Sequence, residues 1–129
     1  MTKNLSWKIY DDVIESIMAL SKSFYPNEFS GMLYAENNVI QDIYIIPKTI
    51  SNRNNAIIRL DLVPMSLNII GSVHSHPSGF GKPSIADLNF FSRKYVNIIS
   101  YFPFSKNCFK VYDNLGHIID NFEIIFRQK

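Results

Sequence analysis

Two histidines and a carboxylate stand at a spacing that suits one metal ion. His74 and His76 are separated by a single residue, and Asp87 follows shortly after them. On a β-strand, side chains two positions apart point to the same face, so both imidazoles can reach one ion. Zinc accepts histidine nitrogens at about 2.0–2.1 Å and carboxylate oxygens at about 2.0–2.2 Å. Three protein ligands leave a fourth position open, as in a catalytic rather than a structural zinc site.

The same residues also have a purely structural explanation. A histidine in a strand is more often a core or surface residue than a ligand, and two at this spacing can arise by chance. Ser84 can cap the N-terminus of a helix, and Asp87 can return the second bond of a capping box. This explanation does not exclude metal binding, because Ser84 could cap the helix while its hydroxyl faces the metal site.

A zinc hydrolase also needs a base that takes a proton from water and delivers it to the leaving amine. The upstream candidates are Glu15, Glu28 and Glu36. Glu15 falls on the exposed face of a predicted helix, and Glu36 falls in a polar turn. Glu28 lies between Pro26 and Gly31, directly before a core strand. Its position favours Glu28 as the base, although spacing alone leaves the choice open.

The elements that must position these side chains can be read from the apolar pattern. An apolar stripe at helical spacing predicts a first helix that ends before Pro26; its members are Ile9, Val13, Ile17 and Leu20. Strands are predicted at 31–35, 39–46, 56–62, 67–76, 96–102, 108–112 and 117–126. A second helix is predicted from Ser84 to about Tyr95, and a hairpin turn at 113–116 between the last two strands. Strands mixed with two helices predict an α/β or α+β sandwich.

The composition is that of one globular domain spanning residues 1–129. The chain is 47% hydrophobic and 19% charged, which excludes a disordered protein, and its length leaves no room for a second domain. The net charge of +2 is small and its lysines and arginines are scattered, which argues against nucleic-acid binding. No signal peptide or membrane-spanning run is visible, so we expect a cytoplasmic protein that does not bind membranes.

The chain has a single cysteine, Cys108. A disulfide within the chain is therefore impossible, which also suits a reducing cytoplasm. Cys108 stands in an apolar stretch, where a packed thiol is expected, although a lone cysteine could also bridge two chains of a homodimer.

The motif resembles that of a known family. HSHP at 74–77, followed after six residues by Ser84 and after two more by Asp87, is similar to the H-S-H-P-x6-S-x2-D motif of the JAMM (MPN+) metalloproteases, which include the prokaryotic JAB proteins. PNEFSG at 26–31 resembles the P-x-E-x-x-G segment of the same family, and GSV at 71–73 is similar to the residues before its first histidine. The order of predicted elements agrees as well, so the resemblance covers most of the chain.

The resemblance implies a role for each motif position. His74, His76 and Asp87 would bind one zinc ion, Glu28 would act as the general base, and Ser84 would donate a hydrogen bond to the oxyanion. The implied fold is a three-layer α/β/α sandwich with a mixed central sheet, like that of cytidine deaminases. The implied reaction is hydrolysis of a peptide or isopeptide bond after the C-terminal glycines of a ubiquitin-like protein, or of a sulfur-carrier protein of the same β-grasp shape.

Two departures from the family bear on specificity. The segment 62–71 before the H-x-H strand is short and contains Pro64, so we expect a truncated crossover where many members have a longer helix. The chain also lacks room for the insertions with which larger members hold ubiquitin. A minimal and permissive enzyme is therefore expected rather than one specific for ubiquitin.

Two alternatives remain open. A RadC-like zinc hydrolase of unknown substrate shares the H-x-H-P-S-G signature, because Ser78 and Gly79 follow Pro77; its usual helix-hairpin-helix region has no space here, and Glu28 favours the protease. A catalytically silent MPN scaffold is the other, although silent relatives typically lose a ligand or the glutamate. A histidine-triad hydrolase is excluded by Ser78, and a base deaminase by the single cysteine. His117, beside the hairpin turn, is expected to be a solvated turn residue.

Overall fold

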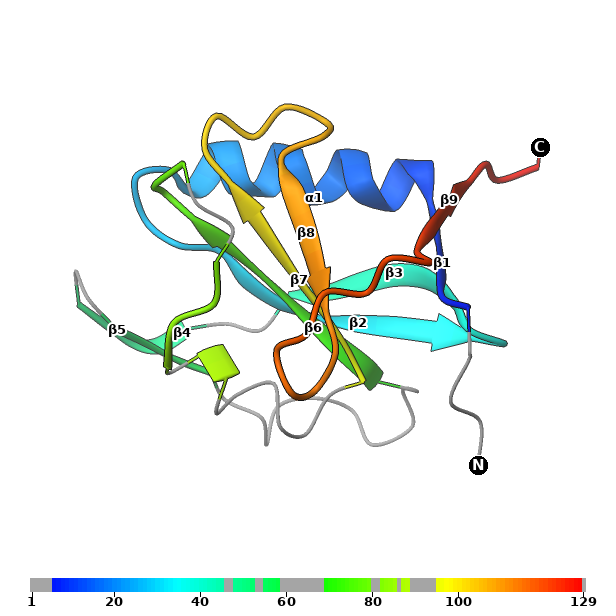
Figure 1. The fold of residues 1–129 in the computed structure, drawn as a ribbon. Coiled ribbons are helices and arrows are strands. Elements are labelled where there is room, and N and C mark those ends of the chain that lie inside the picture. Colours follow the sequence, from blue (N-terminus) through cyan, green and yellow to red (C-terminus); the bar gives the residue numbers. More distant parts are fainter. Residues whose placement is uncertain are drawn as a thin grey trace.

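A mixed, twisted sheet forms the centre of the protein (Figure 1). The computed structural model describes residues 6–45, 48–52, 55–58, 69–79, 82–85, 87–88 and 95–128. The sheet has seven strands in the order β8-β7-β6-β2-β3-β1-β9. Their bounds are β1 Lys8–Tyr10, β2 Ser30–Glu36, β3 Val39–Ile45, β6 Ile69–His76, β7 Val96–Tyr101, β8 Phe109–Tyr112 and β9 Glu123–Ile125. A separate two-stranded sheet consists of β4 Lys48–Asn52 and β5 Asn55–Ile58.

The strand β6 lies near the middle of the large sheet and ends in the two histidines. It pairs antiparallel with β2 and parallel with β7. Gly71 permits the close approach of β7, because a Cβ atom at this position would lie 2.1 Å from the carbonyl oxygen of Val96. The hydrogen bonds of β6 with β2 and with β7 therefore fix the backbone that carries His74 and His76.

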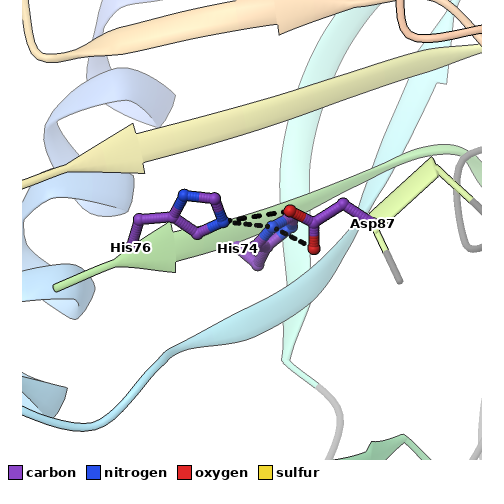
Figure 2. Close-up of side chains that lie close together, drawn as sticks. All are labelled: His74, His76 and Asp87. Atoms are coloured by element: carbon purple, nitrogen blue, oxygen red, sulfur yellow. Dashed lines mark hydrogen bonds and ion pairs between the residues drawn. The ribbon is translucent and has the colours of Figure 1, made fainter. Parts of the chain in front are cut away.

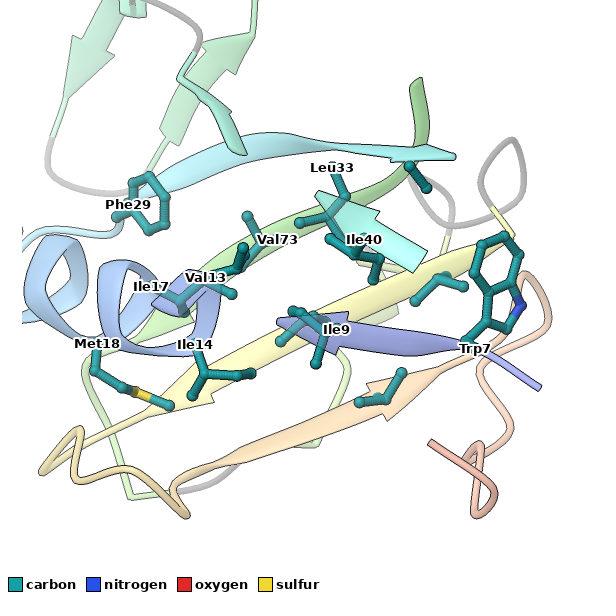
Figure 3. Packing of buried hydrophobic residues seen from close by; sticks show 14 of the residues in the cluster. Trp7, Ile9, Val13, Ile14, Ile17, Met18, Phe29, Leu33, Ile40 and Val73 are labelled. Atoms are coloured by element: carbon teal, nitrogen blue, oxygen red, sulfur yellow. The ribbon is translucent and has the colours of Figure 1, made fainter. Parts of the chain in front are cut away.

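One helix, α1 Asp11–Phe24, packs against one face of this sheet (Figures 1 and 3). Its buried apolar residues meet the buried side chains of β1, β2 and β6; the cluster includes Ile9, Val13, Ile14, Ile17, Phe29, Leu33 and Val73. The hydroxyl of Ser21 also fixes α1 to β7, since its oxygen lies 2.7 Å from the Ser100 oxygen. The main hydrophobic core thus lies between α1 and the sheet, and the opposite face of the sheet remains for the site.

The predicted α/β fold is confirmed, and the second helix begins where the motif placed it. Ile85, Asp87 and Leu88 are helical, and the backbone N–H of Leu88 donates to the carbonyl of Ser84 at 3.0 Å. Residue 86 and residues 89–94 of the predicted helix lie outside the described residues. Of the segment 62–71, where a short crossover was expected, residues 62–68 lie outside them too, and residues 69–71 belong to β6. No helix in the described part of the chain is long and apolar enough to cross a membrane.

Two predictions that concern β1 and β9, at one edge of the sheet, were wrong. Ile9 belongs to β1, where it pairs with Ile40 and Ile124, and not to the first helix. The segment 117–126 forms the predicted hairpin only at its start, where Ile118 bridges to Tyr112 and the N–H of Ile119 donates to the Val111 carbonyl at 2.9 Å. The chain instead continues to the other edge of the sheet, where β9 pairs parallel with β1.

The small sheet and the last turn complete the comparison with the sequence. The strand β4 had not been predicted, and the predicted strand at 56–62 corresponds to β5 as far as residue 58. The turn at 113–116 is present, with the N–H of Asp113 donating to the carbonyl of His117 at 2.8 Å. The His117 side chain is 75% exposed and lies 3.6 Å from the Asp113 carboxylate, which agrees with a solvated turn residue.

Candidate metal centre

The two histidines of β6 point away from α1. Their neighbours Val73 and Ser75 face the helix side, where Val73 is part of the main core. Alternation along the strand therefore turns His74 and His76 to the opposite face. Their side chains are 7% and 14% exposed, and the Asp87 side chain is 16% exposed, so the centre lies just below the surface.

The three predicted ligands converge on one point (Figure 2). His74 Nε2 lies 3.0 Å from Asp87 Oδ1, and His76 Nε2 lies 3.1 Å from Asp87 Oδ2. The two Nε2 atoms are 3.2 Å apart. Within the described part of the chain, His74, His76 and Asp87 form a group whose possible ligand atoms all lie within 4.8 Å of one another, close enough to share a metal ion. The sequence alone had placed the same residues together.

These distances fit a zinc ion. With metal–ligand bonds of about 2.1 Å and tetrahedral angles, ligand atoms lie about 3.4 Å from one another. The distances between the imidazole nitrogens and the carboxylate oxygens are within a few tenths of an ångström of that value. Two imidazoles and one carboxylate are also the donor types that zinc prefers. The site therefore fits zinc in both the spacing and the chemistry of its donors.

The electrostatics of the centre keep the carboxylate ionised. Burial acts to raise the pKa of Asp87, but hydrogen bonds from His74 and His76 and attraction to His74 outweigh it. A hydrogen bond from the backbone N–H of Ser84 adds to them, so the pKa of Asp87 is held well below its usual range. A metal ligand must be deprotonated, and Asp87 meets that condition before any ion binds.

A complete capping box positions Asp87. The N–H of Asp87 donates to Ser84 Oγ at 3.1 Å, and the N–H of Ser84 donates to Asp87 Oδ2 at 2.8 Å. Both explanations of the motif therefore apply at once, because the carboxylate that closes the capping box also faces the histidines. Ser84 Oγ accepts a hydrogen bond here, which leaves its hydroxyl hydrogen available for donation.

The register of β2 and β6 brings the segment that carries Glu28 alongside the end of β6. Ser30 pairs with His74, and the pairing continues beyond the strand, since the N–H of Ser75 donates to the Phe29 carbonyl at 2.9 Å. The N–H of Phe29 donates to Ser75 Oγ, and Glu28 directly precedes this last contact between the two segments. Glu28 is exposed, and it lies two residues before Ser30, the partner of His74 in the ladder.

Two supporting residues were not singled out by the sequence analysis. Ser75 is fully buried, and its Oγ accepts a hydrogen bond of 2.8 Å from the N–H of Phe29. A small hydroxyl residue between two outward histidines was the available signal. Leu88 lies close to Gly116, where an added Cβ would be 2.3 Å from Leu88 Cδ2. The turn after β8 therefore supports the helix that carries Asp87, and no local sequence pattern indicates a contact this distant along the chain.

Comparison with known proteins is consistent with this geometry. The family described as prokaryotic homologs of the JAB domain matches residues 11–112. A protein of Haloferax volcanii named "Probable metalloprotease" is 34% identical over 119 residues, which cover 84% of this chain and 74% of that relative.

Two solved structures share the fold over nearly their whole length. A JAB1/MPN domain protein from Archaeoglobus fulgidus, AF2198, superimposes with a TM-score of 0.75 at 28% identity, covering 92% of this chain and 98% of that one. A structure described as "JAMM: A Metalloprotease-like Zinc Site in the Proteasome and Signalosome" gives a TM-score of 0.74 at 27% identity, covering 94% and 99%.

Proposed function

The chain belongs to the family of prokaryotic homologs of the JAB domain, a family of JAMM type, and from this we propose that it is a zinc-dependent peptidase with one ion per chain. The ligands would be His74, His76 and Asp87. The observation that carries the proposal is the convergence of two imidazole nitrogens and one carboxylate within 3.0–3.2 Å of one another. Three protein ligands suit a catalytic zinc site, because a fourth position stays open for the reaction.

Each remaining motif residue has a task that its position supports. When bound, zinc would supply the Lewis acidity that polarises the scissile carbonyl and acidifies a water molecule. Glu28, which is exposed and lies two residues before the partner of His74, would accept the proton of the attacking water and pass it to the leaving amine. Ser84 would donate its hydroxyl hydrogen to the oxyanion, since its oxygen already accepts the bond from Asp87.

The proposed substrate is the C-terminal tail of a ubiquitin-like or sulfur-carrier protein of β-grasp shape, cleaved at a peptide or isopeptide bond. Glu28 and Ser84 are both exposed, so the centre opens directly to the surface. A flexible, extended tail can reach such a site without unfolding its own domain. The proposed location is the cytoplasm, where the single cysteine, Cys108, would stay reduced.

The test combines metal analysis with cleavage of fusion proteins. Purified protein should contain about one zinc ion per chain and should cut peptide or isopeptide fusions to β-grasp proteins of its own host. Glu28→Gln keeps all three ligands, so it should retain the zinc while turnover falls by at least about 100-fold, the low end for a general base.

Two results would contradict this proposal. Zinc-loaded protein that cuts no fusion, while Glu28→Gln captures none of them, would support the silent scaffold instead. Unchanged turnover in Glu28→Gln would remove that residue from the reaction and leave the identity of the base open.

A further inference from the structure

The turn after β8 reaches the residue that follows the Asp87 ligand. Leu88 comes directly after Asp87, and a Cβ atom added to Gly116 would lie 2.3 Å from Leu88 Cδ2 and 3.7 Å from its Cγ. The Leu88 side chain therefore lies against the glycine backbone, where any larger side chain would displace it (Figure 1). Gly116 also has a φ angle of 85°, a conformation that other residues adopt only at a cost. Both properties of this position favour glycine.

Hydrogen bonds within the turn 113–117 give it a defined shape. The N–H of Asp113 donates to the His117 carbonyl at 2.8 Å, and the N–H of Gly116 donates to the Asp113 carbonyl at 3.1 Å. Asp113 Oδ1 accepts the N–H groups of Leu115 at 2.8 Å and of His117 at 2.9 Å. These hydrogen bonds fix Gly116 relative to β8, which ends directly before Asp113.

A buried asparagine connects this turn to the strand of the histidines. Asn97 Nδ2 donates to the Asp113 carbonyl at 3.4 Å, and Asn97 Oδ1 accepts a hydrogen bond of 2.6 Å from the hydroxyl of Ser72. Both Asn97 and Ser72 are fully buried. Ser72 stands two residues before His74 in β6, so the two side chains share a face of the sheet. The turn is therefore tied to the face that carries the metal centre.

The position of Leu88 in the helix couples it to the metal ligand. The N–H of Leu88 donates to the Ser84 carbonyl at 3.0 Å, and the N–H of Asp87 donates to Ser84 Oγ at 3.1 Å. Leu88 and Asp87 thus belong to one hydrogen-bonded turn of helix, and a shift of one residue moves the other. Zinc binding depends on the Asp87 carboxylate, whose oxygens lie 3.0 and 3.1 Å from the two imidazole nitrogens.

We propose that the contact between Leu88 and Gly116 positions the Asp87 carboxylate and thereby sets the zinc affinity of the centre. This inference rests on the proposed function, because it assumes that His74, His76 and Asp87 bind zinc. Replacing a residue that orients a metal ligand typically weakens metal binding by about 10–100-fold. A ligand that is already in place also loses less conformational freedom on binding. Leu88 and Gly116 are therefore positioning residues, and neither takes part in bond cleavage.

The test measures the zinc Kd of purified, metal-free protein by competition with a chromophoric chelator. Leu88→Ala removes the side chain that lies against Gly116, and we expect it to weaken zinc binding by about tenfold. Leu88→Met keeps an apolar side chain of similar volume, so its Kd should stay within about twofold of the wild type. Since Leu88 is 38% exposed, both variants should fold.

A double-mutant cycle tests whether Leu88 acts through Gly116. In Gly116→Ala the new methyl group takes the place of Leu88 Cδ2, so this variant should also weaken zinc binding by about tenfold. Because both substitutions disrupt one contact, the double variant should bind zinc about tenfold, rather than about 100-fold, more weakly than the wild type.

Asn38→Ala is the matched control for backbone strain. Asn38 also has a positive φ angle, 64°, and it lies in the turn between β2 and β3. The Tm measured with a chelator should therefore fall in Asn38→Ala as it does in Gly116→Ala, because alanine is strained at both positions. The zinc Kd of Asn38→Ala should stay that of the wild type.

Zinc affinity and cleavage together separate this inference from the proposed function. A Leu88→Ala protein with the zinc Kd of the wild type, or effects that multiply in the double variant, overturns the positioning role and leaves the proposed peptidase standing. A zinc Kd that depends on Leu88 and Gly116, in a protein that cuts no β-grasp fusion, overturns the peptidase and leaves the positioning role standing. A wild-type protein that binds no zinc overturns both.

Discussion

Ser84 combines two tasks that single substitutions can separate. Its Oγ accepts the N–H of Asp87 as a helix cap, while its hydroxyl hydrogen is proposed to serve the oxyanion. Ser84→Ala removes both and should lower the free energy of unfolding by about 1 kcal/mol. Glycine is a tolerated N-cap, so Ser84→Gly should cost only a few tenths of a kcal/mol. Neither variant can donate a hydrogen bond, and kcat should fall by about 10²–10³ in both.

Urea unfolding and kcat measurements on zinc-loaded protein decide between these tasks. Equal loss of activity with unequal loss of stability supports a catalytic hydroxyl. If activity instead follows stability, so that Ser84→Gly stays close to the wild type, Ser84 is only a helix cap.

Single residues were also the level at which the sequence was most informative. The alternation of side chains along a strand is sufficient to place His74 and His76 on one face, and the capping box is a local pattern. The convergence of Asp87 on the histidines needs the loop between them to fold back, which no local rule specifies. The position of Ser75 against Phe29 depends on the β2–β6 register, which is a long-range pairing.

At the level of elements, Ser75 connects the start of β2 to the end of β6 and so holds the segment that carries Glu28. Its Oγ is the acceptor for the buried N–H of Phe29. Ser75→Ala leaves that donor without a partner, which should lower the free energy of unfolding by about 1–3 kcal/mol. Zinc content should remain, because both histidines keep their strand, whereas kcat should fall as Glu28 loses its fixed position.

Zinc analysis, thermal unfolding and kcat on one preparation test this expectation. Ser100→Ala is a suitable control, since Ser100 is also fully buried and hydrogen-bonded but lies in β7, towards α1. It should reduce stability without a comparable effect on kcat. Loss of zinc in Ser75→Ala would instead mean that the serine orders the ligands themselves.

The elements that the sequence predicted well are those with a strong local signal. The helix α1 ends before Pro26 as expected, and the turn at Asn37 and Asn38 uses positive φ angles of 54° and 64°, which asparagine tolerates. Ile9 was assigned to the helix because it stands four residues before Val13, and the chain passes from β1 to α1 without a break. The position of β9 beside β1 is a long-range pairing, which apolar periodicity cannot specify.

For the molecule as a whole, the sheet separates two functions. The face towards α1 contains the main apolar core, and the other face contains the ligands beside a smaller buried cluster of Ile99 and Tyr112. The composition and the order of the predicted elements were enough to predict the α/β class, because both can be read along the chain. The strand order was not predictable, since it depends on which distant segments pair.

Metal removal should test the stability of the whole domain. The folded chain holds the three donors together and the unfolded chain does not, so zinc at 100 times its Kd should add about 2.7 kcal/mol to the free energy of unfolding. For a domain of this size, we expect the Tm to rise by about 10 °C over the chelated protein. Asp87→Asn keeps an oxygen for the capping box but loses the charged ligand, so zinc should no longer raise its Tm. A rise in Asp87→Asn as large as in the wild type would mean that zinc stabilises the protein from another site.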